Sequence, residues 1–159
     1  MAGLTGNPAE TVFWELSQGW TASNATHPVG GAAMTPKFTF EGSTAHVQPD
    51  GEEGTIRCWT VGEMVREYPD LYNAYVTRKE RVRVQLRTQV YGLHLKYRTE
   101  VERLINALDA TVIDARADGA DASHDYYRAY VERWSDISIY PGGQVSSATV
   151  LLQMFWEDR

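Results

Sequence analysis

Seven basic residues are concentrated in the window 78–98, and they are the part of the sequence best suited to binding chemistry. Glu80 is the only acid there, so the window carries a net charge of +6 while the rest of the chain carries −12. On a β-strand, alternate residues share a face, so Arg81, Arg83 and Arg87 would project together. A row of guanidinium groups binds phosphate or carboxylates. We predict that these three arginines form an intersubunit or partner contact; the alternative is a solvated basic face.

The histidines and the single cysteine show no catalytic or metal-binding pattern. The histidines are His27, His46, His94 and His124. None has the His-x-x-x-His or His-Glu-x-x-His spacing of a metal site, and Cys58 alone cannot form an internal disulfide. The chain also contains no Gly-x-Ser-x-Gly nucleophile motif and no Gly-x-x-x-x-Gly-Lys phosphate loop. We therefore predict no catalytic residue, no cofactor and no metal.

Composition places the chain among globular proteins. Its 159 residues are 43% hydrophobic and 11% aromatic, which predicts one domain over 1–159. The net charge of −6 argues against general nucleic-acid binding. No apolar run approaches the length of a membrane span, and no signal-peptide pattern is present. We expect synthesis in the cytoplasm, and a place in the virion if the protein comes from a phage.

Capping patterns predict where the helices begin. Asn7-Pro8, with an acid at position 10, indicates a helix that ends at Gly19. The capping boxes that start at Thr60 and Thr99 predict a short helix over 60–68 and the main helix over 99–109. A fourth helix, over 123–134, is expected from a Ser cap and an apolar face of 3.6-residue period.

Residues 81–91 fit two structures. Val82, Val84 and Leu86 alternate as in a strand, yet the apolar positions up to residue 108 also fit one long helix from Leu71. We favour a strand over 81–91, because a capping box at 99–102 would be wasted inside a continuous helix and Gly92 indicates a break.

The remaining segments predict strands and loops. Expected strands are 38–41 and 44–47 (a hairpin), 55–60, 111–114, 136–140 and 147–156. The last has apolar residues on both faces, so both sides should be covered. The loop 21–36 and the tip 48–54 are expected to be flexible, or ordered by a partner. The fold class is α+β: an antiparallel sheet with an N-terminal helix, one main helix packed on it and a closing C-terminal strand.

This order of elements resembles the tail-terminator and head–tail neck proteins of long-tailed bacteriophages. The matching segments are 8–18, 38–40, 56–59, 82–90, 99–108 and 150–156, while 60–80 and 120–134 are additional. The resemblance implies a structural protein of the virion that forms a homo-oligomeric ring, a hexamer capping the tail tube. It also implies other structural proteins as partners and no catalytic residues.

The second functional hypothesis is a small ligand-binding or lyase-like α+β domain. In that case a curved sheet would fold around a pocket lined by aromatic side chains. The candidates are Trp20, Trp59, Tyr91, Trp134 and Trp156.

Overall fold

The computed structural model describes residues 7–41, 51–67, 75–117 and 120–157. The helices are α1 (Pro8–Gly19) and α2 (Tyr91–Ala107), with a 3-10 turn at Ala22–Asn24. The strands are β1 (Lys37–Phe40), β2 (Thr55–Glu67), β3 (Tyr75–Thr88), β4 (Ile113–Ala117), β5 (Ala120–Tyr126), β6 (Arg128–Trp134), β7 (Ser138–Tyr140) and β8 (Gly143–Glu157).

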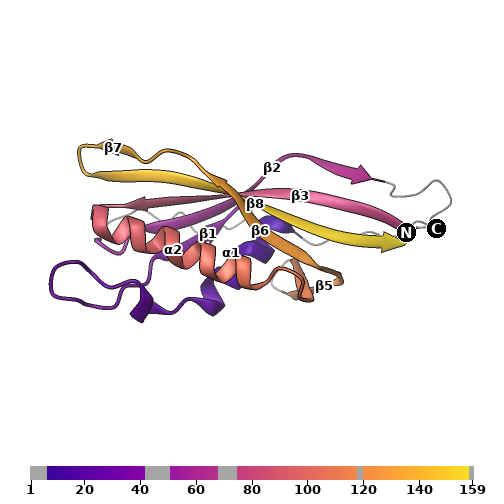
Figure 1. Ribbon diagram of the computed structural model, residues 1–159, viewed down its shortest axis with the longest axis horizontal. Helices are drawn as coiled ribbons and strands as arrows, with labels where there is room; N and C mark the ends of the chain where they lie inside the picture. Colours follow the sequence, from indigo (N-terminus) through magenta and orange to yellow (C-terminus); the bar gives the residue numbers. More distant parts are fainter. Residues whose placement is uncertain (1–6, 42–50, 68–74, 118–119, 158–159) are drawn as a thin grey trace.

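Six of these strands form one sheet, and β4 and β5 form a separate hairpin. The order in the sheet is β1-β2-β3-β8-β6, with β7 also paired to β8 (Figure 1). β1 runs parallel to β2, and the other pairs are antiparallel. The predicted α+β fold, with an N-terminal helix and a C-terminal strand, is confirmed.

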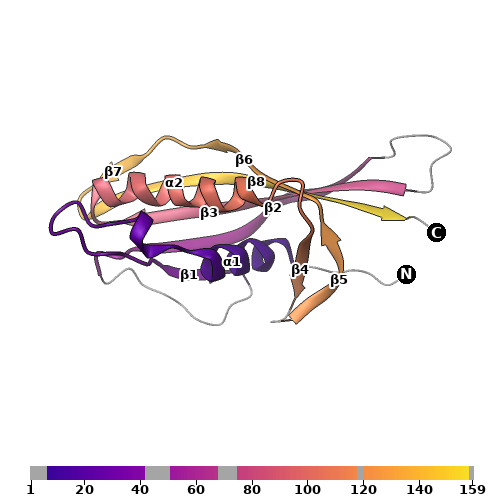
Figure 2. The ribbon, with the colours of Figure 1, turned by 60° about the horizontal axis from the view of Figure 1, so that its bottom comes forward.

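Both helices lie on the same face of the sheet (Figure 2). Alternate residues of β3 point toward them, and Val82, Val84 and Leu86 are fully buried. α1 packs over β2, β1 and β3 and against β4, whereas α2 packs over β3, β8 and β6. We call the opposite face, which no described helix covers, the outer face. The ends of β2, β3 and β8 run on past both helices (Figures 1 and 2).

The start of α1 is as predicted. The Asn7 side chain accepts a hydrogen bond from the Glu10 amide at 3.1 Å, and Pro8 occupies the first helical position. Asn7 thus satisfies one of the four amides that a helix N-terminus leaves without a partner.

Residues 81–91 form a strand to Thr88, as predicted, but the predicted start of the main helix is wrong. α2 begins at Tyr91, eight residues before Thr99. The Thr99 hydroxyl instead donates to the Leu95 carbonyl inside the helix at 3.2 Å. Gly92 lies in the first turn, where a Cβ would come within 3.1 Å of Pro28, so it marks a close contact and not a break.

Thr99→Ala is therefore expected to change the free energy of unfolding by less than about 0.5 kcal/mol. Asn7→Ala is expected to cost about 1 kcal/mol, because the amide of Glu10 loses its acceptor. Urea denaturation of both variants measures the difference. A larger loss in the Thr99 variant would contradict a start of α2 at Tyr91.

Two other predicted helices are strands. Residues 60–67 continue β2, which pairs with β3 up to Glu67. Residues 123–134 fall in β5 and β6, and β6 pairs with β8. In both cases long-range pairing overrides a local sequence signal.

The shorter strands agree with expectation in part. The strand expected at 111–114 is β4, that at 136–140 is β7, and the last one starts earlier, at Gly143. Instead of forming an antiparallel hairpin, β1 pairs in parallel with β2. The other half of that hairpin, 44–47, and residues 48–50 of the tip lie outside the described residues. The described part of the tip contacts the core, since the Tyr97 hydroxyl donates to the Glu53 carbonyl at 2.7 Å.

The loop 21–36 is held by its own chain. The buried Glu100 carboxylate accepts from the Thr21 amide at 3.0 Å and from the Asn24 side chain at 3.1 Å. The Lys96 ammonium donates to the Thr26 carbonyl at 2.8 Å. These contacts attach the loop to α2.

Candidate basic surface on the outer face

The three arginines predicted to form a contact do share the outer face. They alternate along β3 with the buried Val82, Val84 and Leu86. The structure places each of them in a different local environment, however.

Arg81 and Arg87 already have partners within the chain. Arg81 forms an ion pair with Glu132 of β6, its Nε lying 2.8 Å from the carboxylate. Arg87 donates to the Tyr140 hydroxyl at 2.8 Å, and its guanidinium lies 5.7 Å from the centre of that ring. Arg81 therefore has an acid partner within its own chain.

Arg83 is different, because its side chain forms no hydrogen bond or ion pair with any described residue. It lies across the sheet from Thr149 of β8, and Thr149 lies across from Arg133 of β6. Three neighbouring strands thus align Arg83, Thr149 and Arg133 in one row of the outer face. Arg133 likewise has no acid partner among the described residues.

A β-bulge brings Arg133 to this face. The β6–β8 register shifts between Val131, which pairs with Val150, and Arg133. Val131 packs against the core, and the extra residue allows both Glu132 and Arg133 to face outward. Sequence reasoning missed Arg133 because it assigned 123–134 to a helix. The signal that could have found it is the alternation of residues 129 and 131, which is broken once before Trp134.

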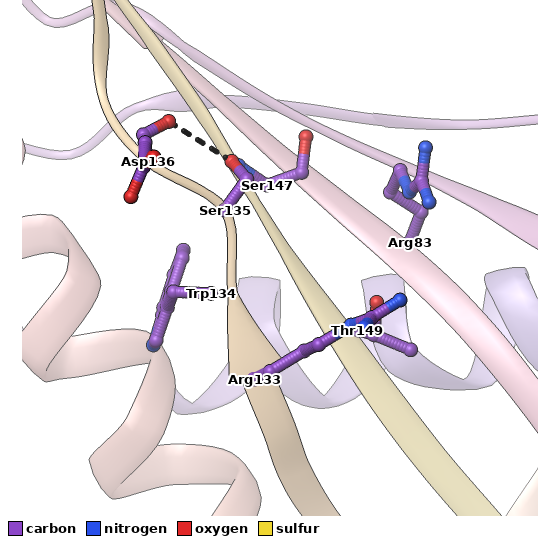
Figure 3. Close-up of a pocket in the computed structure, with 7 residues that line it drawn as sticks. All are labelled: Arg83, Arg133, Trp134, Ser135, Asp136, Ser147 and Thr149. Atoms are coloured by element: carbon purple, nitrogen blue, oxygen red, sulfur yellow. Dashed lines mark hydrogen bonds between the residues drawn. The ribbon is translucent and has the colours of Figure 1, made fainter.

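Arg83 and Arg133 line a hollow of about 370 Å³ (Figure 3). We call it the arginine hollow; its lining residues are Arg83, Arg133, Trp134, Ser135, Asp136, Ser147 and Thr149. Its one acid, Asp136, lies at the other end from the two arginines in Figure 3. The Ser135 hydroxyl is used within the chain: it accepts from the Ser147 amide at 2.9 Å and donates to the Asp136 carbonyl at 3.1 Å.

A second hollow, of about 470 Å³, lies nearer to β1 on the same face. It is lined by Glu41, Arg57, Trp59 and Gln85. The Arg57 guanidinium lies 5.9 Å from the centre of the Trp59 ring, and Glu41 accepts from the Thr60 amide at 3.0 Å. Among the described side chains, the outer face therefore carries more arginines than acids, in an acidic protein.

A histidine paired with a hydroxyl occurs on the helix side, but it is not an accessible catalytic pair. The His94 ring bonds to the Ser146 hydroxyl at 2.7 Å and to the Thr88 hydroxyl at 2.8 Å. All three residues are buried, His94 completely. Burial, with the nearby charge of Arg98, lowers the pKa of His94 to about 4. The ring is thus neutral and acts as a polar link between α2, β3 and β8.

The described residues contain no cluster of three or more His, Cys, Asp or Glu side chains that could hold a metal ion. Cys58 is a free, buried thiol on β2, and burial raises its pKa, so it is not an activated nucleophile. Within the same described ranges, no helix is both long and apolar enough to cross a membrane.

The aromatic residues proposed for a pocket do not gather around one cavity. Trp20 packs edge-on against Phe38 and Tyr97 in the core, at 5.6 and 5.3 Å between ring centres. Trp59 lies on the opposite face of the sheet, across from Arg83. Trp134 donates its indole N–H to Glu102 of α2, with Arg98 over its ring. Tyr91 is exposed, and the side chain of Trp156 lies outside the described part.

No protein-family model matches this chain, and no curated protein matches its sequence closely enough to show a relationship.

Proposed function

We propose that this chain is a non-enzymatic structural protein that assembles with copies of itself through the outer face of its sheet. Within that role, we propose a ring-forming component of a phage tail terminator or neck. The observation that carries the proposal is a sheet whose helices all cover one face, while the other presents Arg57, Arg83 and Arg133 without an acid partner among the described residues.

Several features support assembly. Apart from the arginines, the outer face carries Trp59, and a mix of arginine and aromatic groups is typical of protein contacts. The chain outside 78–98 is strongly acidic, so one copy offers charges that complement the basic face of the next. Beyond the helices, the ends of β2 and β8 flank β3 and offer further strand backbone for contact (Figure 1).

The order of elements supports the more specific role. An N-terminal helix, a sheet, a helix packed on it and a closing strand are the features on which the resemblance to tail-terminator proteins rests. Residues 60–67 lengthen β2, while 120–134 form β5 and β6, which are additional to the elements of the resemblance. Head-to-tail contacts of this kind close into rings when the rotation between copies allows it.

Reversing two charges tests the assembly. The wild-type chain is expected to sediment as a multimer, and Arg83→Glu with Arg87→Glu is expected to shift it toward monomer. The loss should be greatest at low salt, because screening weakens interactions between exposed charges. Sedimentation velocity at two salt concentrations measures both effects.

A control variant distinguishes an effect at the outer face from an effect of the change in net charge. Arg98 lies on α2, on the helix side, so Arg98→Glu changes the net charge as Arg83→Glu does but at a different surface. It should leave the sedimentation coefficient unchanged, and circular dichroism checks that each variant folds. A monomeric wild type, or equal assembly of the double variant, would contradict the proposal.

A further inference from the structure

We propose that the arginine hollow is an oxyanion site that receives a side-chain carboxylate from a neighbouring copy of this chain. The inference rests on the proposed function and names the contact at its centre. Its basis is the row formed by Arg83, Thr149 and Arg133, which three adjacent strands hold in register.

The spacing of the row allows an anion to bind between the two guanidinium groups. Adjacent strands in a sheet are about 4.8 Å apart, so the backbones of Arg83 and Arg133 are separated by about 10 Å with β8 between them. Figure 3 shows both side chains on the same side of the hollow, with Thr149 between their strands. Arginine presents several N–H donors in a planar fork, which matches the two oxygens of a carboxylate.

Hydroxyl donors complete the site. Ser147 and Thr149 face the hollow from β8, and neither hydroxyl has a hydrogen-bond partner among the described residues. Ser135 is already used within the chain, so it fixes the wall of the hollow and does not bind the anion. Asp136 would repel an anion, which directs the ligand to the arginine end.

The neighbouring ion pair between Arg81 and Glu132 shows how the position of Arg83 and Arg133 differs. One row further along β3, Arg81 is neutralised by Glu132 at 2.8 Å. The bulge gives Arg81 an acid and, at the next residue, leaves Arg133 without one. An acidic chain that keeps two unpaired arginines around one hollow has the complementary carboxylates on its own other surfaces, which favours a second copy over a different ligand.

The test compares two neutralised pairs in the full chain. Sedimentation equilibrium gives the dissociation constant of the assembly for the wild type, for Arg83→Gln with Arg133→Gln, and for the control Arg98→Gln with Arg116→Gln, whose two arginines lie on α2 and β4, away from the outer face. The first pair should weaken assembly by at least about tenfold, and the control pair, which changes the net charge equally, by less than about threefold. Circular dichroism establishes that each variant is folded.

Inorganic phosphate at constant ionic strength provides a second measurement on the unaltered protein. Phosphate should compete for the hollow, so it should weaken assembly of the wild type and of the Arg98/Arg116 variant more than chloride does. It should have no such effect on the Arg83/Arg133 variant. Amide shifts at Ser147 and Thr149 on adding phosphate locate its binding.

The outcomes separate this inference from the proposed function. A wild type that assembles, with an Arg83/Arg133 variant that assembles equally well, overturns the inference alone. Phosphate binding at Ser147 and Thr149 without any effect on assembly also overturns it, because the hollow is then a site for free anions. A wild type that stays monomeric overturns the proposed function and the inference together.

Discussion

Replacing Glu100 with alanine is expected to lower the free energy of unfolding by about 2–4 kcal/mol. The Glu100 side chain is almost completely buried and accepts from three groups. Arg103 donates to it twice at 2.7 Å, and the Thr21 amide and the Asn24 side chain bind it from the loop 21–36. Alanine leaves those donors without their acceptor.

The protonation state of Glu100 is consistent with this role. Burial by itself raises the pKa of the carboxyl, but the hydrogen bonds from Arg103, the Thr21 amide and Asn24 outweigh it, and the net pKa lies below its ordinary value. Urea denaturation measures the loss of stability in Glu100→Ala, and amide exchange at Thr21 measures the release of the loop. Glu100→Gln, which keeps one acceptor oxygen, should lose less. Unchanged exchange at Thr21 in the alanine variant would show that Glu100 does not hold the loop.

Acidification should remove about 3 kcal/mol of stability through His94 alone. Its pKa is about 4 in the folded protein, below the ordinary value of 6.5, because burial and then the charge of Arg98 disfavour the protonated ring. A group whose pKa is lowered by folding binds fewer protons in the folded state. Its contribution is therefore fully present above about pH 6.5 and is lost as the pH falls toward 4.

Two measurements test the His94 prediction. NMR titration of the ring should give a pKa well below 6.5. Unfolding free energies at several pH values should fall between pH 6.5 and 4 in the wild type, and less steeply in His94→Gln, which cannot titrate. Because Gln also disturbs the bonds to Thr88 and Ser146, the slope with pH and not the absolute stability decides the outcome. An ordinary pKa for His94 would contradict the prediction.

Local signals predicted those elements in which one residue type decides the conformation. Asn7 before Pro8 specifies the start of α1, and the alternation of Val82, Val84 and Leu86 specifies the buried face of β3. The same alternation placed Arg81, Arg83 and Arg87 on one surface. These predictions succeeded because they depend on neighbours within a few residues.

The predictions failed where pairing between segments distant in the sequence determines the conformation. The boxes starting at Thr60 and Thr99 have the residues of a helix cap, but β2 pairs with β3 at the first and α2 already continues through the second. In 123–134 a bulge interrupts the two-residue period of β6, so the spacing of its apolar residues resembles that of a helix. The partner of Arg81 could not be predicted for the same reason: Glu132 is 51 positions away and reaches it only through this bulge.

The central position of β8 has a consequence for how the molecule forms. Its partner on one side is β3, and even their nearest residues, such as Thr88 and Gln144, are 56 positions apart in the chain. Contacts at such separations close late and slow folding. During synthesis, β2 and β3 emerge and can pair before β8 leaves the ribosome. Until then β3 lacks the strand that pairs with its second edge. We therefore expect the sheet to be completed only when β8 pairs with both β3 and β6.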